Sequence, residues 1–174
     1  MTNEITKQII INSFIYAFSK FVELDYAAIK NNTHEQCMSG RLGMYLREYF
    51  IDLEKDNIRV DVEYNRDKGN PKCENQSLPY SNKSNPYIRP DVLIHERDTD
   101  NNILYCEIKK NNGTDAEKVR RQVNGERRYK FGIYIDRINT NNITLNLLEK
   151  SNENFEKYVF DCNSKHLTLE QTNE

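Results

Sequence analysis

The sequence lacks the features that mark several classes of protein. It contains no tryptophan, and its aromatic residues, 10% of the chain, are all tyrosine or phenylalanine. No apolar run approaches the roughly 20 residues of a membrane-spanning helix, because polar residues interrupt even the longest one, "IIINSFIYAF". The first residues, "MTNEITKQ", do not contain the short apolar segment of a signal peptide. These absences predict a cytoplasmic protein that makes no use of a membrane.

Cysteine and histidine are too few and too widely spaced for a disulfide framework or a zinc site. The four cysteines include no CxxC pair, and the three histidines lie far apart. Cys37 and Cys106 lie in apolar patterns, which predicts buried free thiols. No Ser–His–Asp or Cys–His triad can be argued from the spacing. The net charge is −2, so any basic binding surface must be local.

A length of 174 residues suits a single domain. The apolar pattern predicts a helix over 4–28 and a second helix starting at Thr33, with Gln36 completing a capping box. A third helix, capped by Thr114 or Asp115, is predicted to reach Arg128. The predicted strands cover 57–65, 89–95, 102–109, 131–138 and 143–149, with a short element at 156–162 before a frayed polar tail. This order predicts an α/β domain with a mixed central sheet flanked by helices.

Charged residues interrupt the two strands at 89–95 and 102–109. Side chains alternate along a strand, so Leu104, Cys106 and Ile108 should face the core. Glu107 and Lys109 should face the other way. If the two strands are antiparallel neighbours, Asp91 lies near Glu107 at one end of the hairpin. The pattern therefore predicts two carboxylates and an amine on one face of the sheet.

This cluster indicates chemistry on phosphate. Two converging carboxylates repel each other unless a proton or a cation lies between them. Mg²⁺ takes one or two protein carboxylates and keeps waters for a phosphate substrate. A nearby lysine can position or deprotonate the attacking water, or stabilise charge on the phosphate. The alternative is that these residues form weak ion pairs in solvent.

The residues that carry this cluster resemble a known motif. "PD" at 90–91 precedes "EIK" at 107–109 by fifteen residues, which is similar to the PD-(D/E)XK nuclease superfamily. That superfamily includes restriction endonucleases, Holliday-junction resolvases and many phage and defence nucleases. Its core of helix, three strands, helix and strand resembles the order predicted for residues 33–137. The helix at 4–28 and the C-terminal strands and tail at 141–174 would then flank a restriction-endonuclease-like core.

The resemblance assigns roles to individual residues. It implies that Asp91 and Glu107 are ligands of Mg²⁺ or Mn²⁺, that the carbonyl of Ile108 completes the metal shell, and that Lys109 is the motif lysine. Many members also place a glutamate on the first core helix, and Glu35 is the candidate here. The alternative for Glu35 is a simple complement to the helix dipole.

One branch of the superfamily carries Q-x-x-x-Y on the helix after the motif. Here Gln122 precedes Tyr129 by seven residues rather than four, so the signature of that branch is not matched.

The segment 109–130 is strongly basic. It holds eight basic residues against three acidic ones in a chain whose net charge is −2. Neutralisation of phosphates supplies most non-specific affinity for nucleic acid. The predicted nucleic-acid contacts are Lys110, Lys118, Arg120, Arg121, Arg127 and Arg128. The alternative is a solvated helix face with pairs such as Glu117 and Arg120.

Two further features allow more than one interpretation. The loop at 66–88 contains tyrosines and lysines that can track a phosphate backbone or belong to a plain insertion: Arg66, Lys68, Lys72, Tyr80, Lys83 and Tyr87. His95 shares a face with Asp91 by alternation, and it reads as a site neighbour or as a partly buried strand residue.

The sequence therefore predicts a metal-dependent nuclease with DNA as the expected substrate. The alternative is a catalytically inactive module of the same fold that binds nucleic acid or a partner protein. The small size leaves little room for a separate specificity domain, which favours a homodimer or a subunit of a larger system.

Overall fold

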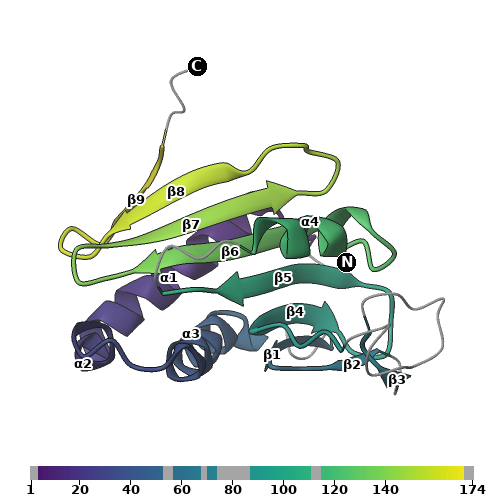
Figure 1. The fold of residues 1–174 in the computed structure, drawn as a ribbon, viewed down its shortest axis with the longest axis horizontal. Helices are drawn as coiled ribbons and strands as arrows, with labels where there is room; N and C mark the ends of the chain where they lie inside the picture. Colours follow the sequence, from purple (N-terminus) through teal and green to yellow (C-terminus); the bar gives the residue numbers. More distant parts are fainter. Residues whose placement is uncertain (1–3, 53–56, 68–69, 74–86, 111–114, 171–174) are drawn as a thin grey trace.

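The computed structural model describes residues 4–52, 57–67, 70–73, 87–110 and 115–170. N-terminal helices precede a seven-stranded mixed sheet, and a further helix packs on that sheet (Figure 1). The helices are α1 (Lys7–Leu24), α2 (Tyr26–Lys30), α3 (Glu35–Tyr49) and α4 (Ala116–Asn124). The strands are β1 (Ile58–Val62), β2 (Arg66–Asp67), β3 (Asn70–Pro71), β4 (Val92–Glu96), β5 (Asn102–Ile108), β6 (Phe131–Ile138), β7 (Asn142–Glu149), β8 (Glu156–Asp161) and β9 (His166–Leu169). The predicted α/β class with a mixed sheet is confirmed.

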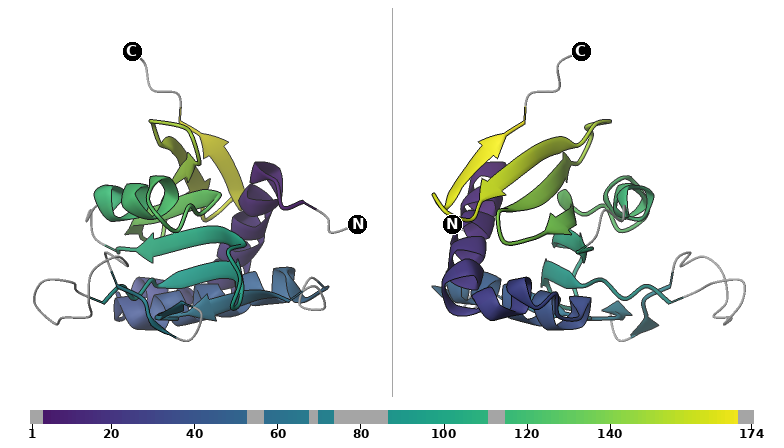
Figure 2. Two further views of the ribbon diagram at one scale, coloured as in Figure 1. Left: turned by 90° about the vertical axis from the view of Figure 1, so that its right-hand side faces the viewer. Right: turned by 60° about the vertical axis from the view of Figure 1, so that its left-hand side comes forward.

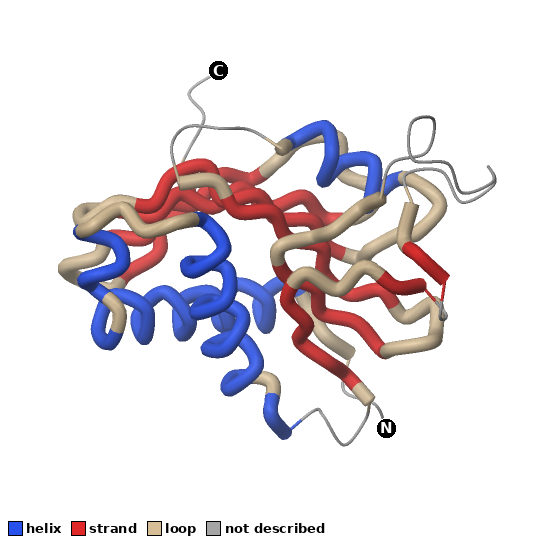
Figure 3. Tube along the Cα trace, turned by 60° about the horizontal axis from the view of Figure 1, so that its bottom comes forward, coloured by secondary structure: helices blue, strands red, loops and turns tan. Residues whose placement is uncertain are grey.

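The strand order of the main sheet is β1-β4-β5-β6-β7-β8-β9. Strands β5 and β6 are parallel, and every other neighbouring pair is antiparallel. Helix α4 connects the two parallel strands. Figures 2 and 3 show α4 on one face of the sheet and α1 with α3 on the other side of it. Strands β2 and β3 form a separate short hairpin.

Two apolar cores fill the two faces of the sheet. The larger core joins the N-terminal helices to the sheet and includes Phe14, Leu42, Leu104, Cys106 and Ile108. The alternation predicted for β5 is therefore confirmed on this side. The smaller core lies under α4 and contains Ile88, Leu93, Tyr105, Val119, Val123, Tyr129 and Leu148.

Several predicted boundaries are wrong at the N-terminal end. The helix predicted over 4–28 ends at Leu24, where Asp25 serves as C-cap and accepts a hydrogen bond from the hydroxyl of Tyr45. His34, not Thr33, is the N-cap of α3, and its Nδ1 accepts from the amide of Gln36 at 3.3 Å. The hydroxyl of Thr33 donates to a carbonyl in the preceding helix instead.

Two other boundaries and one burial prediction also differ. Helix α4 ends at Asn124 rather than Arg128: its C-cap Gly125 has extended backbone, and Arg128 has a positive φ of 50°. Part of the expected frayed tail forms β9, which pairs with β8. Cys37 is exposed rather than buried, because it lies on the outer face of α3.

Gly132 in β6 lets α4 approach the sheet closely. A Cβ on Gly132 would overlap with the side chains of Val119 and Val123, whereas a Cβ on Gly40 of α3 would meet no heavy atom within 4 Å. We expect Gly132→Ala to lower the free energy of unfolding by about 1–3 kcal/mol through overpacking. Gly40→Ala should raise it by about 0.5–1 kcal/mol, the usual gain in a helix. Urea denaturation compares the two variants, and a Gly132→Ala protein as stable as wild type would contradict this packing.

Candidate active site

Asp91 and Glu107 lie opposite each other where β4 begins and β5 ends. Val92 pairs with Cys106 in the antiparallel register, so Asp91 and Glu107 occupy the next positions outward. The carboxylate Oδ2 of Asp91 accepts a hydrogen bond from the amide of Ile108 at 2.7 Å. Figure 1 shows this end of β5 lying above α3. The predicted adjacency of the two strands is confirmed, and it brings the two acidic residues to one end of the hairpin.

Glu107 is a buried carboxyl, with 2% of the residue exposed. Its Oε1 accepts a hydrogen bond from the hydroxyl of Tyr105 and lies 2.7 Å from Nζ of Lys118 on α4. Burial raises the pKa of Glu107 from its ordinary value of 4.5 to about 7, and the nearby charge of Asp91 adds to this. Lys118 and Tyr105 act in the opposite direction. The protein thus holds an acidic group in an environment that disfavours its charge.

Asp91 is half-buried, and its surroundings also act on its pKa in opposite directions. Burial raises the pKa of Asp91, although the amide of Ile108 and the charges of Lys109 and Lys118 oppose the rise. Two neighbouring carboxyls with raised pKa values favour a proton or a cation between them. The pair is therefore suited to bind a positive ligand.

Glu35 reaches the motif from a distant part of the chain. Its carboxylate Oε2 lies 3.4 Å from Nζ of Lys109, although 74 positions separate the two residues. Its Oε1 accepts from the amide of Lys110 at 3.3 Å. The first turn of α3 holds Glu35 beside the end of β5. The residue chosen from the resemblance thus lies against the motif lysine.

Lys109 is surrounded by carboxylates. Its Nζ contacts Glu35 and lies 3.7 Å from Oδ2 of Asp115, the N-cap residue of α4. Burial alone would lower the pKa of Lys109, but the charges of Asp115, Glu35 and Asp91 outweigh it and raise the pKa. The amine is therefore held as an ammonium beside the acidic pair.

The acidic pair fits Mg²⁺ by its chemistry. Within the described ranges, no group of three or more histidine, cysteine, aspartate or glutamate side chains is arranged to hold a metal ion. Mg²⁺ needs only one or two carboxylates, because waters and substrate phosphates complete its shell. Asp91 and Glu107 supply two such carboxylates, and cation binding would relieve the repulsion between them. Ile108, the third expected ligand, is buried in β5.

The predicted nucleic-acid contacts fall into different environments. Lys118 is engaged with Glu107, and Nζ of Lys110 donates to the carbonyls of Asn32 and Thr33 at 3.0 and 2.9 Å. Arg121 and Arg128 are exposed. The exposed cations leave part of the expected basic surface accessible on the α4 side of the molecule.

Two of the predicted arginines make internal contacts. Arg120 pairs with Glu117, donates to the carbonyl of Glu153 at 3.4 Å and lies over the ring of Phe155. Arg127 is only 8% exposed and donates to the side chain of Gln122 and to the carbonyl of Cys73. The predicted phosphate contact of Arg127 is therefore wrong, because its guanidinium lies inside the domain.

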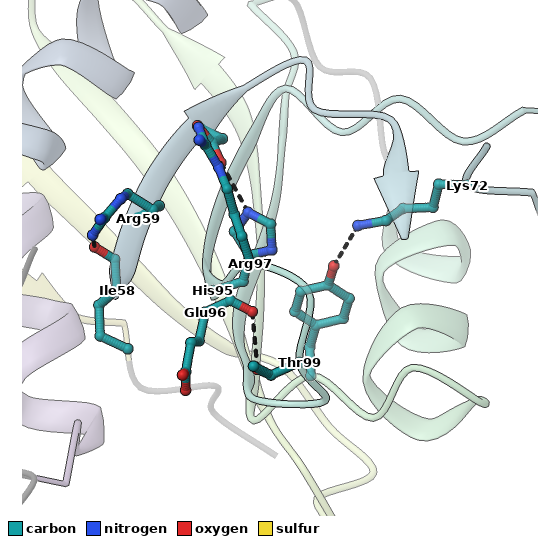
Figure 4. Close-up of polar contacts among 9 residues, drawn as sticks. Ile58, Arg59, Lys72, His95, Glu96, Arg97 and Thr99 are labelled. Atoms are coloured by element: carbon teal, nitrogen blue, oxygen red, sulfur yellow. Dashed lines mark hydrogen bonds and ion pairs between the residues drawn. The ribbon is translucent and has the colours of Figure 1, made fainter. Parts of the chain in front are cut away.

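His95 lies away from the acidic pair. Its Nε2 lies 2.9 Å from Oδ2 of Asp61, and Figure 4 draws this contact as the dashed line at His95. The ring of His95 also packs against Tyr64. Arg97 also binds Asp61. Burial would raise the pKa of Asp61, but the hydrogen bonds from His95 and Arg97 hold it well below its usual range. His95 is thus a buried strand residue in a separate polar cluster.

The loop at 66–88 is only partly described, since Lys68, Tyr80 and Lys83 lie outside the described residues. Arg66 and Tyr87 are exposed. Lys72 is only 2% exposed, and its Nζ donates to the hydroxyl of Tyr129 at 2.9 Å, as Figure 4 shows. Lys72 therefore packs inside the domain rather than along a phosphate backbone.

Sequence reasoning missed three contributors to the site. Tyr105 lies two positions before Glu107 on the same face of β5, so strand alternation could have placed it. Asp115 was identified only as a helix cap, and Lys118 only as a phosphate contact. No local signal pairs Lys118 with Glu107, because that contact depends on how α4 lies across the sheet.

Comparison of the chain with protein-family models, with curated proteins and with solved structures finds no match. Among the residues that the structure describes, no helix is both long enough and apolar enough to cross a membrane. The acidic pair and its neighbours are therefore the features of this chain that bear on function.

Proposed function

We propose that this protein is a Mg²⁺-dependent nuclease that hydrolyses phosphodiester bonds, with DNA as its expected substrate. One observation carries the proposal. Glu35, Asp91, Glu107 and Lys109 come from three separated segments and converge at one end of the β4–β5 hairpin. The order α3, β1, β4, β5, α4, β6 also supports a restriction-endonuclease-like core, because it resembles the core order of the PD-(D/E)XK superfamily.

The side chains divide the chemical work. Asp91 and Glu107 would hold the cation, which when bound neutralises phosphate charge and makes water a better nucleophile. Lys109 has a raised pKa and therefore remains an ammonium near neutral pH. An ammonium has no acceptor for a proton, so we assign it to positioning the attacking water and stabilising charge on the phosphate. Glu35 holds this ammonium in place.

The substrate assignment follows from local charge. The exposed side chains of Arg121 and Arg128 lie on the segment that follows the motif. Cations beside a phosphodiester-cleaving site would supply sequence-independent affinity. We therefore expect binding that weakens as the salt concentration rises.

A cleavage assay tests the proposal directly. The full chain should be incubated with supercoiled, linear, single-stranded and branched DNA and with RNA, in Mg²⁺ or Mn²⁺. Cleavage of at least one DNA substrate that EDTA abolishes is the expected result. Absence of cleavage from every substrate with both metals would overturn the enzymatic assignment.

The metal site can be tested without a substrate. A ligand that binds only the folded state raises its melting temperature by mass action. We expect Mg²⁺ or Mn²⁺ to raise the melting temperature of the wild type and to have no effect on Asp91→Ala. In EDTA the variant loses one of two repelling carboxyls but also the acceptor for the amide of Ile108, so each protein's melting temperature in EDTA is the baseline for its own metal-induced shift. Equal metal-induced shifts in both proteins, measured by calorimetry, would exclude Asp91 as a ligand.

A second candidate function has one observation in its favour. Glu107 already has a cation partner in Lys118, as it would in a protein that holds no metal. In that case the domain would be an inactive module that binds nucleic acid or a partner protein. Salt-dependent binding of DNA without cleavage or metal binding would support the nucleic-acid version of this alternative.

A further inference from the structure

We propose that Lys118 is a tethered cation that competes with the metal ion for Glu107. In this view the Lys118–Glu107 ion pair and the metal complex are mutually exclusive states of the site. The inference rests on the metal site of the proposed function and adds a regulatory residue to it. Lys118 is thereby assigned a role distinct from that of the motif lysine.

The contact between Lys118 and Glu107 is direct. Their Nζ and Oε1 atoms lie 2.7 Å apart, which is the length of a strong charge-assisted hydrogen bond. The side chain of Glu107 is 3% exposed, whereas that of Lys118 is 33% exposed. The carboxylate is thus fixed in the interior, and the lysine approaches it from the solvent side.

The packing of α4 fixes the position of the Lys118 backbone. Val119 and Val123 are fully buried in the smaller core, so α4 is anchored to the sheet next to Glu107. Lys118 adjoins Val119 in this helix, and its long flexible stem spans the remaining distance. The backbone can therefore stay in place while the ammonium leaves.

Lys118, rather than Lys109, is the lysine that contacts Glu107. The charge of Lys118 opposes the raised pKa of Glu107 and, together with the charge of Lys109, that of Asp91. Lys109, the other nearby lysine, contacts Glu35 and Asp115. The ammonium of Lys118 is thus the cation in contact with Glu107, while the charges of Lys109 and Lys118 both act on Asp91.

A metal ion and the ammonium of Lys118 cannot both bind Glu107 strongly at the same time. An ammonium has only donors and cannot serve as a metal ligand, and like charges a few ångströms apart repel strongly in a partly buried site. Metal binding must therefore break the ion pair and turn Lys118 towards solvent. The free energy of the ion pair is lost from the observed metal affinity.

Metal titration of four full-length proteins tests this competition. Calorimetry with Mn²⁺ and Mg²⁺ at about pH 8 would compare wild type, Lys118→Met, Lys118→Arg and Arg120→Met. Glu107 has a pKa of about 7, so this pH limits competition from protons. Arg120→Met is the matched control, because it removes one positive charge from α4 without touching Glu107; Arg120 pairs with Glu117 instead.

We expect Lys118→Met to bind metal about tenfold or more tightly than wild type, the scale of one hydrogen bond to a charged group. Arg120→Met should stay within about twofold of wild type, the small effect of a partly exposed charge. Lys118→Arg keeps a cation that can donate to Glu107 and cannot bind a metal ion, so it should stay closer to wild type than Lys118→Met does. Circular dichroism would verify that each protein is folded. Tight binding by Lys118→Met with none by wild type would support the competition even more strongly.

Two results would overturn the inference, and they differ in what else they remove. Metal binding by wild type with equal or weaker binding by folded Lys118→Met would reject the competition and leave the proposed nuclease site intact. An equal gain in Arg120→Met would assign the effect to general charge and reject the specific role. No saturable metal binding by any of the four proteins would remove both the competition and the metal site of the proposed function.

Discussion

Lys109→Ala is expected to lower the turnover of a cleaved DNA substrate by about a hundredfold or more, the usual scale for losing a group that acts in the chemical step. The ammonium lies against Glu35 and Asp115 beside the acidic pair. It donates only, so it is not required to hold a divalent cation. The effect should therefore fall on kcat, with a modest change in KM from one lost phosphate contact.

Three measurements separate a chemical role for Lys109 from a structural one. The melting temperature and the metal-induced shift of Lys109→Ala should remain close to those of wild type. Lys130→Ala is a suitable control, because Lys130 carries the same charge and pairs with Glu4, away from the acidic pair. A loss of turnover below about fivefold would contradict the assignment of Lys109 to the chemical step.

Strand alternation was the part of the sequence that predicted the candidate site best. It placed Cys106 and Ile108 towards one core and Glu107 towards the other face, and the structure has them there. The turn between β4 and β5 is short, so antiparallel pairing and the position of Asp91 followed from local geometry. Alternation succeeds because the side-chain period of a strand is fixed at two.

Contacts that depend on how helices lie across the sheet could not be predicted in this way. The ion pair between Lys118 and Glu107 forms only because α4 packs across this part of the sheet. The buried Arg127 contacts the carbonyl of Cys73, which lies 54 positions away in the chain. A run of basic residues looks uniform in a sequence. Tertiary packing divides it into exposed, paired and buried members.

Helix and strand ends were also beyond local patterns. Helix α4 stops at Gly125, although residues that favour helices continue to Arg128. Strand β9 has no strong apolar pattern, and it forms because β8 offers it backbone hydrogen-bond partners. An ion pair of 2.5 Å between Lys157 of β8 and Glu170, the residue after β9, adds to this pairing. Pairing with an existing strand outweighs weak intrinsic propensity.

The pH dependence of stability should show the strain in the acidic pair. The pKa of Glu107 is about 7 in the folded protein, against an ordinary value of 4.5. The unfolded chain therefore releases this proton at a lower pH than the folded one. Stability from this group is fully present below about pH 4.5 and is lost as the pH rises to about 7. The loss amounts to at most about 3 kcal/mol, from 1.36 kcal/mol per pKa unit.

Glu107→Gln should remove this loss. The amide oxygen can still accept from Tyr105 and Lys118, but it does not ionise. In EDTA, urea denaturation between about pH 4 and pH 8 should show wild type losing up to about 3 kcal/mol more than the variant. In Mg²⁺, the loss of wild-type stability above pH 7 should be offset, because the cation binds the ionised carboxylate, while the variant should respond weakly. Parallel pH profiles of the two proteins in EDTA would contradict a strained carboxyl at position 107. A variant that responds to Mg²⁺ as wild type does would show that the cation binds elsewhere.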